Sequence, residues 1–199
     1  MRTTVTVSLI TLLVGIGLAS WFFLRPNASG TSIDTSRAAV VKEMRQIGRL
    51  ETASFTIEKI IEAKKEEGSP WRDILFGDKL LLIAHGEVVA GFDFANLTEA
   101  NVRTTGGTLR LELPAPQILS VRLDNEQTRV YDRSQGFLAR GNKDLETEAR
   151  QAAEKEIRDA ACQADILEAA SANATKQIKA LMGAFGFSET IVEIPVAEC

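Results

Sequence analysis

Few residues of this chain are suited to chemistry. His85 is the only histidine, which excludes a site with several histidine ligands and leaves one candidate base for a nucleophile. It precedes Gly86 between two β-rich runs, so we expect both residues at the tip of a hairpin. Near His85 in the sequence, no serine or cysteine forms a nucleophile motif, and we predict no catalytic residue.

Acidic residues and glycines form no recognisable binding motif either. The pair Glu66-Glu67 and the acidic residues between Asp144 and Glu148 lack the spacing of an EF-hand loop, so a solvated charged face is the simpler interpretation. The pair Gly106-Gly107 lacks the lysine and the following helix of a phosphate-binding loop, and we interpret it as a turn. The sequence therefore predicts no metal site and no cofactor.

The two cysteines, Cys162 and Cys199, are too few for a disulfide framework and lack the spacing of a metal site. They can pair with each other if the domain lies in an oxidising compartment. The simpler interpretation is two unpaired thiols, with Cys162 buried on a helix.

Trp71 and Phe76 are candidates for an interaction or structural role. With Ile74 and Leu75 they form an apolar cluster in residues 64–78, a segment for which we expect a loop. We interpret the cluster as a flap that covers the core, and the alternative is a contact surface for lipid or a partner.

Asp93 is the third candidate. It stands between Phe92 and Phe94 at the expected end of a strand, so its carboxylate must face solvent or find hydrogen-bond donors. We expect a structural role, in which it accepts hydrogen bonds from backbone amides of the following loop.

The N-terminal segment Val5 to Leu24 carries no charge, and at about 1.5 Å per residue it matches the hydrocarbon thickness of a bilayer. We predict a tail over residues 1–4, a transmembrane helix over residues 5–24 that contacts the lipid bilayer, and a linker over residues 25–33. The alternative is a signal peptide with its cleavage site at Gly17-Leu18-Ala19. The short tail favours a single-pass protein of an inner or cytoplasmic membrane, with the C-terminal domain outside the cytoplasm.

Residues 34–199 are predicted to form one soluble α+β domain with one core. A helix capped by Asp34 or Ser36 should end at Gly48. Alternating apolar and polar residues then indicate strands. The expected strands cover residues 50–63, 79–84, 87–94, 102–105, 108–113, 117–123 and 128–131, where Tyr131 packs at a strand end, and residues 190–194 form the last one.

From Asp144 onward the pattern is helical and rich in alanine. One apolar stripe holds Ala149, Ala153, Ile157, Ala160, Ala164, Leu167, Ala174, Ile178, Leu181 and Phe185. An uninterrupted helix would span about 60 Å, so we expect a break at which Asp165 caps a new helix and Glu168 returns the bond. The predicted fold is α+β, with a small, mainly antiparallel sheet packed against C-terminal alanine-rich helices.

Charge and composition exclude some function classes. The net charge is -4 without a cluster of Lys and Arg, which argues against nucleic acid as a partner. With 45% hydrophobic and 25% charged residues the chain is globular.

Ordered segments of the chain resemble a known family. GRLET from Gly48, GEVVAGFDF from Gly86, LELPAP from Leu111, VYD from Val130 and the helical tail are similar to bacterial membrane-anchored proteins catalogued as domain of unknown function 4230. The resemblance covers residues 40–194. It implies an N-terminal anchor and an α+β domain, and it carries no assigned reaction, cofactor or catalytic residue.

The C-terminal part also resembles stomatin and prohibitin (band-seven) domains, on Gly186-Phe187 before Ile191 to Ile194. That likeness implies self-association at a membrane.

Our leading hypothesis from the sequence is a non-catalytic, membrane-tethered scaffold that binds a protein or forms a homo-oligomer. The alternative is a lipid or small-molecule binding domain with the Trp71 loop as lid. A hydrolase that uses His85 ranks third.

Overall fold

A computed structural model describes residues 35–65, 68–139 and 141–199. The tail, transmembrane helix and linker predicted for residues 1–33 lie outside the described residues. Within the described residues, no helix combines the length and the apolar character needed to cross a membrane. The elements in chain order are α2 (Arg37–Ile47), β1 (Arg49–Lys65), α3 (Pro70–Phe76), β2 (Asp78–Asp93), η1 (Glu99–Asn101), β3 (Val102–Thr105), β4 (Thr108–Glu112), β5 (Gln117–Leu123), β6 (Arg129–Gln135), α4 (Leu145–Gln163), α5 (Ile166–Ala184) and β7 (Glu189–Glu193).

Helix α2 begins and ends where its capping residues predict. The Ser36 hydroxyl accepts a hydrogen bond from the N–H of Ala39 at 3.2 Å. At the other end Gly48 adopts a φ of 68° and donates its N–H to the carbonyl of Arg45, as a glycine at a helix end can.

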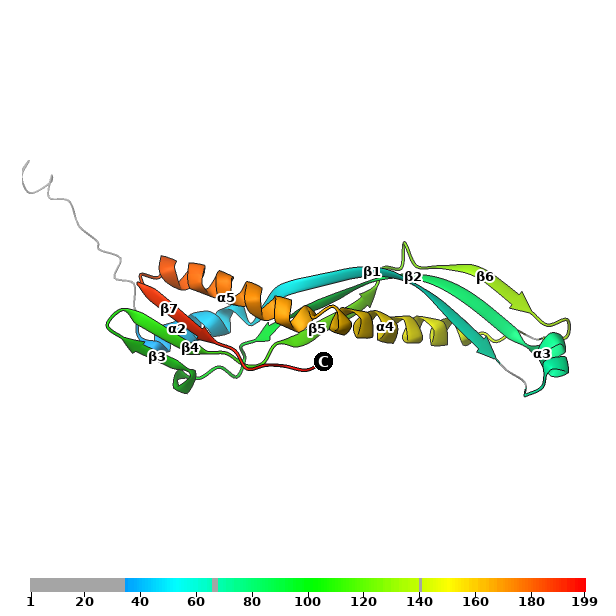
Figure 1. Cartoon of the computed structure of the whole chain (residues 1–199), viewed down its shortest axis with the longest axis horizontal. Helices are drawn as coiled ribbons and strands as arrows, with labels where there is room; N and C mark the ends of the chain where they lie inside the picture. Colours follow the sequence, from blue (N-terminus) through cyan, green and yellow to red (C-terminus); the bar gives the residue numbers. More distant parts are fainter. Residues whose placement is uncertain (1–34, 66–67, 140) are drawn as a thin grey trace, which may run out of the picture. The chain divides into compact units, whose positions relative to one another are not determined.

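Strand β2 is the centre of a four-stranded sheet (Figure 1). On one side it pairs antiparallel with β1 along nearly its whole length, from Arg49 opposite Asp93 to Lys65 opposite Asp78. On the other side β2 pairs first with β6 and then with β5, both antiparallel. The long β1–β2 hairpin is therefore the frame on which the other elements pack.

The hairpin expected at His85 and Gly86 is wrong, because β2 runs through both residues without a turn. Gly86 pairs with Ile57 on β1 and with Leu123 on β5. A β-carbon there would lie 2.7 Å from Cδ1 of Ile157 and 2.9 Å from the carbonyl oxygen of Arg122. Residue 86 is thus a glycine because helix α4 approaches the strand closely, and not because the chain turns.

A second sheet of three strands has the order β3, β4, β7. The predicted turn between β3 and β4 is confirmed, with φ of 58° at Gly106 and 86° at Gly107. Strand β7 pairs with β4 in parallel, which brings the C-terminal segment beside the β3–β4 hairpin. The chain therefore forms two sheets within the described residues, where we expected one.

The predicted break between the C-terminal helices is confirmed at Asp165, which has a φ of 55°. The expected capping box is wrong, because the Asp165 side chain makes no capping hydrogen bond. The buried stripe of α4 also departs from the expected one in its last turn, where Ala161, four residues after Ile157, is buried in place of Ala160.

The domain has two hydrophobic clusters where we expected one core. The first joins α2, the end of β2, the second sheet and the C-terminal half of α5. The second lies between the β1–β2 hairpin, α4 and the first turns of α5. At about 3.3 Å per residue the 17 residues of β1 extend over about 55 Å, which is too long for one cluster to cover.

Helix α5 contributes to both clusters, and polar contacts fix its position on β1. The buried Thr52 donates its hydroxyl to the carbonyl of Ala170 at 2.9 Å, and the side-chain amide of Asn173 donates to the carbonyl of Thr52 at 2.9 Å. These bonds attach the middle of α5 to the strand where one cluster gives way to the other.

Candidate functional site

Exposed apolar side chains gather on α3 and on the turn of residues 136–139 that follows β6. Trp71 is 79% exposed, Ile74 64% and Phe137 92%, so these side chains do not pack over a hydrophobic core. We call the following set the apolar tip: Trp71, Ile74, Leu75, Phe76, Phe137 and Leu138. The flap expected over the core is therefore wrong, and the cluster instead faces outward as a contact surface does.

Residues 70–76 form a helix where we expected a loop. Ser69 precedes Pro70 at the first helical position, and its carbonyl accepts the N–H groups of Arg72 and Asp73 at 3.0 and 2.9 Å. The helix ends at Gly77, whose N–H reaches the carbonyl of Asp73 at 2.8 Å. Within so short a helix Trp71, Ile74 and Leu75 share one face by their spacing.

Backbone hydrogen bonds attach the turn after β6 to α3. Gly136 donates to the carbonyl of Gly77 at 2.8 Å, and Leu138 donates to that of Leu75 at 2.7 Å. A β-carbon at Gly136 would lie 2.7 Å from the nitrogen of Phe76, so glycine is needed for this approach. The two segments of the tip are therefore presented as one unit, beside the C-terminal ends of β1 and β6 (Figure 1).

A buried carboxylate fixes the base of the tip. Asp78 is 3% exposed and accepts two hydrogen bonds from the guanidinium of Arg133, at 3.1 and 2.7 Å, and one from the N–H of Asn142 at 2.8 Å. The hydrogen bonds from Arg133 outweigh the opposing effect of burial and, with the Asn142 amide, hold the pKa of Asp78 below its usual 3.8. The ionised carboxylate thus joins the start of β2, the end of β6 and the segment before α4.

Of the three residues singled out in the sequence, the structure brings Trp71 and Phe76 together in the tip. Asp93 lies at the opposite end of β2, where its carboxylate accepts the N–H of Ala95 at 2.9 Å and lies 3.6 Å from Nε of Arg49. Its partners belong to the loop and the strand next to it. Tyr131, which we expected to pack at a strand end, is 71% exposed on β6.

Sequence reasoning missed Phe137 and Leu138. The available signal was an adjacent apolar pair between Gly136 and Gly141, in a segment otherwise typical of a turn. Nothing in the local sequence shows that this turn meets α3, because the two segments are about 60 residues apart in the chain.

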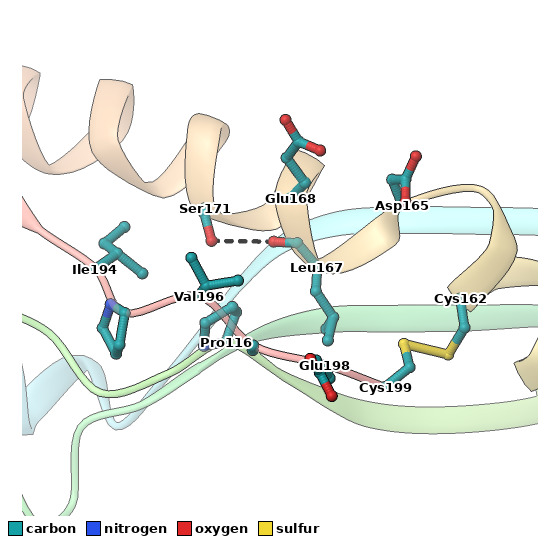
Figure 2. A pocket seen from close by; sticks show the side chains of 12 residues that line it. Pro116, Cys162, Asp165, Leu167, Glu168, Ser171, Ile194, Val196, Glu198 and Cys199 are labelled. Carbon is teal, nitrogen blue, oxygen red and sulfur yellow. Dashed lines mark hydrogen bonds between the residues drawn. A yellow bond between two sulfur atoms is a disulfide. The ribbon is translucent and has the colours of Figure 1, made fainter.

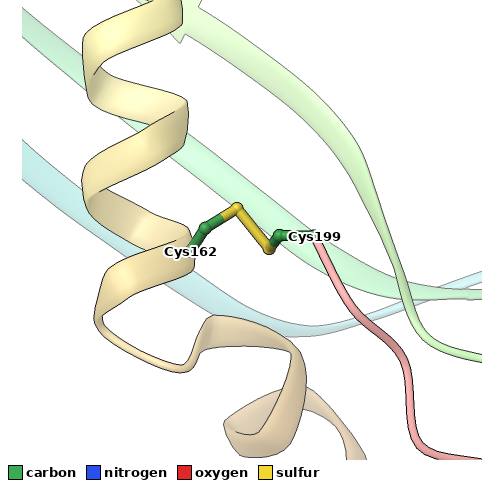
Figure 3. The surroundings of a disulfide bond; sticks show 2 residues. All are labelled: Cys162 and Cys199. Carbon is green, nitrogen blue, oxygen red and sulfur yellow. A yellow bond between two sulfur atoms is a disulfide. The ribbon is translucent and has the colours of Figure 1, made fainter.

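Cys162 and Cys199 form a disulfide, with their α-carbons 5.8 Å apart (Figure 3). The interpretation of two unpaired thiols is therefore wrong. After β7 the chain returns toward the end of α4 and brings residue 199 to the break between the two helices. The bond fixes the C-terminal segment to α4.

The C-terminal segment also lines a cavity of about 620 Å³ next to the disulfide. Its walls include Leu167 and Ser171 from α5, and Ile194 and Val196 from the segment after β7 (Figure 2). The Ser171 hydroxyl donates to the carbonyl of Leu167 at 3.0 Å, within its own helix. The cavity is thus walled by side chains from α5 on one side and by the C-terminal segment on the other.

His85 lies within β2, and its main-chain groups are engaged by the segment after β5. Its carbonyl accepts the N–H of Asp124 at 2.8 Å and the hydroxyl of Thr128 at 3.2 Å. Among residues 35–65, 68–139 and 141–199, no group of three or more His, Cys, Asp or Glu side chains is placed to hold a metal ion.

A comparison with protein families matches residues 42–192, more than half of the chain, to the family model described as protein of unknown function (DUF4230). No curated protein and no solved structure matches the chain. The likeness of the C-terminal part to stomatin and prohibitin domains is not among these findings.

Proposed function

The chain belongs to the DUF4230 family of proteins of unknown function, and we propose that it is a non-catalytic, membrane-tethered domain that acts by contact through its apolar tip. The observation that carries this proposal is the exposure of six large apolar side chains on two segments joined by hydrogen bonds. Burying a side chain such as Trp71 or Phe137 contributes about 1.5–3 kcal/mol. A partner that covers the tip therefore gains substantial binding free energy.

The chemistry of the tip suits binding and not catalysis. Its side chains are hydrocarbons and one indole, and none of them is an acid, a base or a nucleophile. His85 lies on β2 seven residues beyond Asp78, away from the tip along the strand.

The uncharged segment from Val5 to Leu24 supports the membrane tether. The disulfide supports a location of the domain outside the cytoplasm, because such bonds persist in oxidising compartments. We therefore propose that the domain lies outside the cytoplasm, as the short N-terminal tail also favours.

Binding to a second copy through strand pairing is disfavoured. Strand β1 is an edge of the four-stranded sheet, and edge strands can pair with one another. Here β1 carries Glu58, Lys59 and Glu62, and charged side chains on an edge oppose such pairing. The tip is thus the surface through which we expect the domain to make contact with its partner.

Site-specific photo-crosslinking in membranes of the native organism tests the proposal. A photoreactive phenylalanine analogue at position 71 should give cross-links to protein or to lipid. The same group at position 60, where Ile60 is 70% exposed on β1, should give few. Equal yields at the two positions, or none at Trp71, would overturn contact through the tip.

The cavity beside the disulfide favours ligand binding as a second candidate function. Its volume of about 620 Å³ lies within the range of small-molecule sites, and its lining combines apolar Leu167 and Ile194 with acidic Asp165, Glu168 and Glu198. Trp71 does not serve as its lid, because it is not among the residues that line this cavity. Native mass spectrometry of the purified full chain should show a bound small molecule that the cavity-filling variant Ser171→Phe loses; a ligand-free wild type would remove this candidate.

A further inference from the structure

We propose that the apolar tip inserts into the boundary between headgroups and acyl chains of a lipid bilayer. This inference rests on the proposed function and names the partner of the same surface. Two observations favour a bilayer over a protein, namely the side chains present and the small size of the tip, and the reach of the predicted tether adds to them.

The side chains of the tip are those that the membrane interface favours. Trp71, Phe76 and Phe137 are aromatic, and aromatic rings are enriched at headgroup level, where one edge is wet and the other apolar. The aliphatic members, Ile74, Leu75 and Leu138, suit the acyl boundary. Charges of both signs lie beside α3, where Lys64, Lys65 and Lys79 line one surface pocket together with Glu62, Asp73 and Asp78, so net attraction to anionic lipid contributes little.

The tip is too small for a stable protein interface. A standard interface uses about 20–30 residues and about 800 Å² on each partner, well above what these two short segments supply. A bilayer requires no complementary shape, and each inserted side chain gains free energy separately. The rigid attachment of the turn to α3 also means that insertion orders little additional chain.

The predicted tether would make such weak insertion effective. Residues 25–36, between the predicted transmembrane helix and α2, span at most about 40 Å. Strand β1, which separates α2 from α3, covers about 55 Å. A domain held this closely meets the bilayer at a high effective concentration, so a tip that binds weakly by itself stays inserted.

Tryptophan fluorescence of the full chain in vesicles tests the inference. Trp21 is the other tryptophan, so the Trp21→Phe variant leaves Trp71 as the sole reporter. In phosphatidylcholine vesicles with brominated acyl chains, Trp71 should lose most of its emission and should be protected from aqueous iodide. Because the attraction is apolar, quenching should stay the same at high salt and with added anionic lipid.

Two control variants keep the result interpretable. The first control combines three substitutions, Trp21→Phe, Trp71→Phe and Ile60→Trp, so that the only tryptophan lies on β1. Its fluorescence should remain accessible to iodide and unquenched by brominated lipid. In Trp21→Phe with Phe137→Ser and Leu138→Ser, quenching of Trp71 should fall while the thermal unfolding midpoint stays near that of Trp21→Phe, because both replaced side chains are exposed.

The outcomes separate this inference from the proposed function. Trp71 that is shielded from iodide but unquenched by brominated lipid would overturn the bilayer and indicate a second copy of the chain on the tip. Trp71 that is open to iodide would also overturn insertion. In either case the proposed function is judged by cross-linking in native membranes, where any partner of the tip would be present.

Discussion

Ile157 of α4 lies so close to Gly86 of β2 that a β-carbon at residue 86 would be 2.7 Å from its Cδ1 atom. The carbonyl oxygen of Arg122 lies 2.9 Å from the same point and, as part of the β2–β5 ladder, cannot easily move. The packing of the long helix on the central strand therefore depends on the absence of a side chain at this position.

We expect Gly86→Ala to lower the free energy of unfolding by about 1–3 kcal/mol, because an added methyl group forces the helix or the ladder to shift. Urea denaturation measures the change. Gly183→Ala is the matched control, since a β-carbon there meets no atom within 4 Å, and it should stabilise α5 by up to about 1 kcal/mol. Equal stability of Gly86→Ala and wild type would show that the contact carries no energetic weight.

The Asp78 carboxylate should make the stability of the tip depend on pH. Its folded pKa is lowered, so its contribution is present above the unfolded pKa of 3.8 and is lost as the pH falls through the folded value. At neutral pH, Asp78→Asn should cost about 1.5–3 kcal/mol through weakened bonds from Arg133, and this difference from wild type should shrink in strong acid.

Urea midpoints at several pH values measure this effect, and amide exchange should rise in residues 70–76 and 136–139 of the variant. Asp132→Asn, on the same strand as Arg133 but exposed, serves as the control and should change little. A cost that persists unchanged below the folded pKa would contradict a role for the ionised form.

The disulfide should stabilise the domain by about 2–4 kcal/mol, because it closes a loop between residues 37 positions apart. Replacing both Cys162 and Cys199 with serine should lower the free energy of unfolding by that amount, as urea denaturation measures it. Wild type in a reducing agent should then match the double variant. Two free thiols titrated in protein purified without reductant would contradict the pairing.

The attachment of α5 to β1 should depend on the Thr52 hydroxyl. Thr52→Val keeps the shape of the buried side chain but removes the hydrogen bond to Ala170, and it should cost about 1 kcal/mol. Thr56→Val, on an exposed position of the same strand, should stay within about 0.5 kcal/mol of wild type. Thermal unfolding of the two variants provides the comparison.

Local patterns predicted many of the elements. Ser36 and Gly48 bound α2, the Gly106-Gly107 pair turns between β3 and β4, and β5 has the expected bounds, because caps, turns and alternation act over a few residues. The α+β class follows from these elements. The break at Asp165 was inferred from helix length and is also present.

The errors occur where residues distant in the sequence determine the outcome. A glycine required by Ile157 looks the same in sequence as a glycine required by a turn, so β2 was divided at Gly86. The pairing of Cys199 depends on the course of the chain after β7. In the candidate site, Trp71 and Phe76 were found but their exposure was not, because an apolar run does not show which way it faces.

One mechanical property follows from the length of β1, whose 17 residues pair with β2 with one register shift, between Glu51 and Ala53. A strand already advances about 3.3 Å per residue, close to the limit of about 3.6 Å for a taut chain. A pull applied between Arg49 and Lys65, the first and last residues of β1, would pass along the covalent backbone of this one strand. It would lengthen the strand by little, so β1 behaves as a nearly inextensible element along the long hairpin.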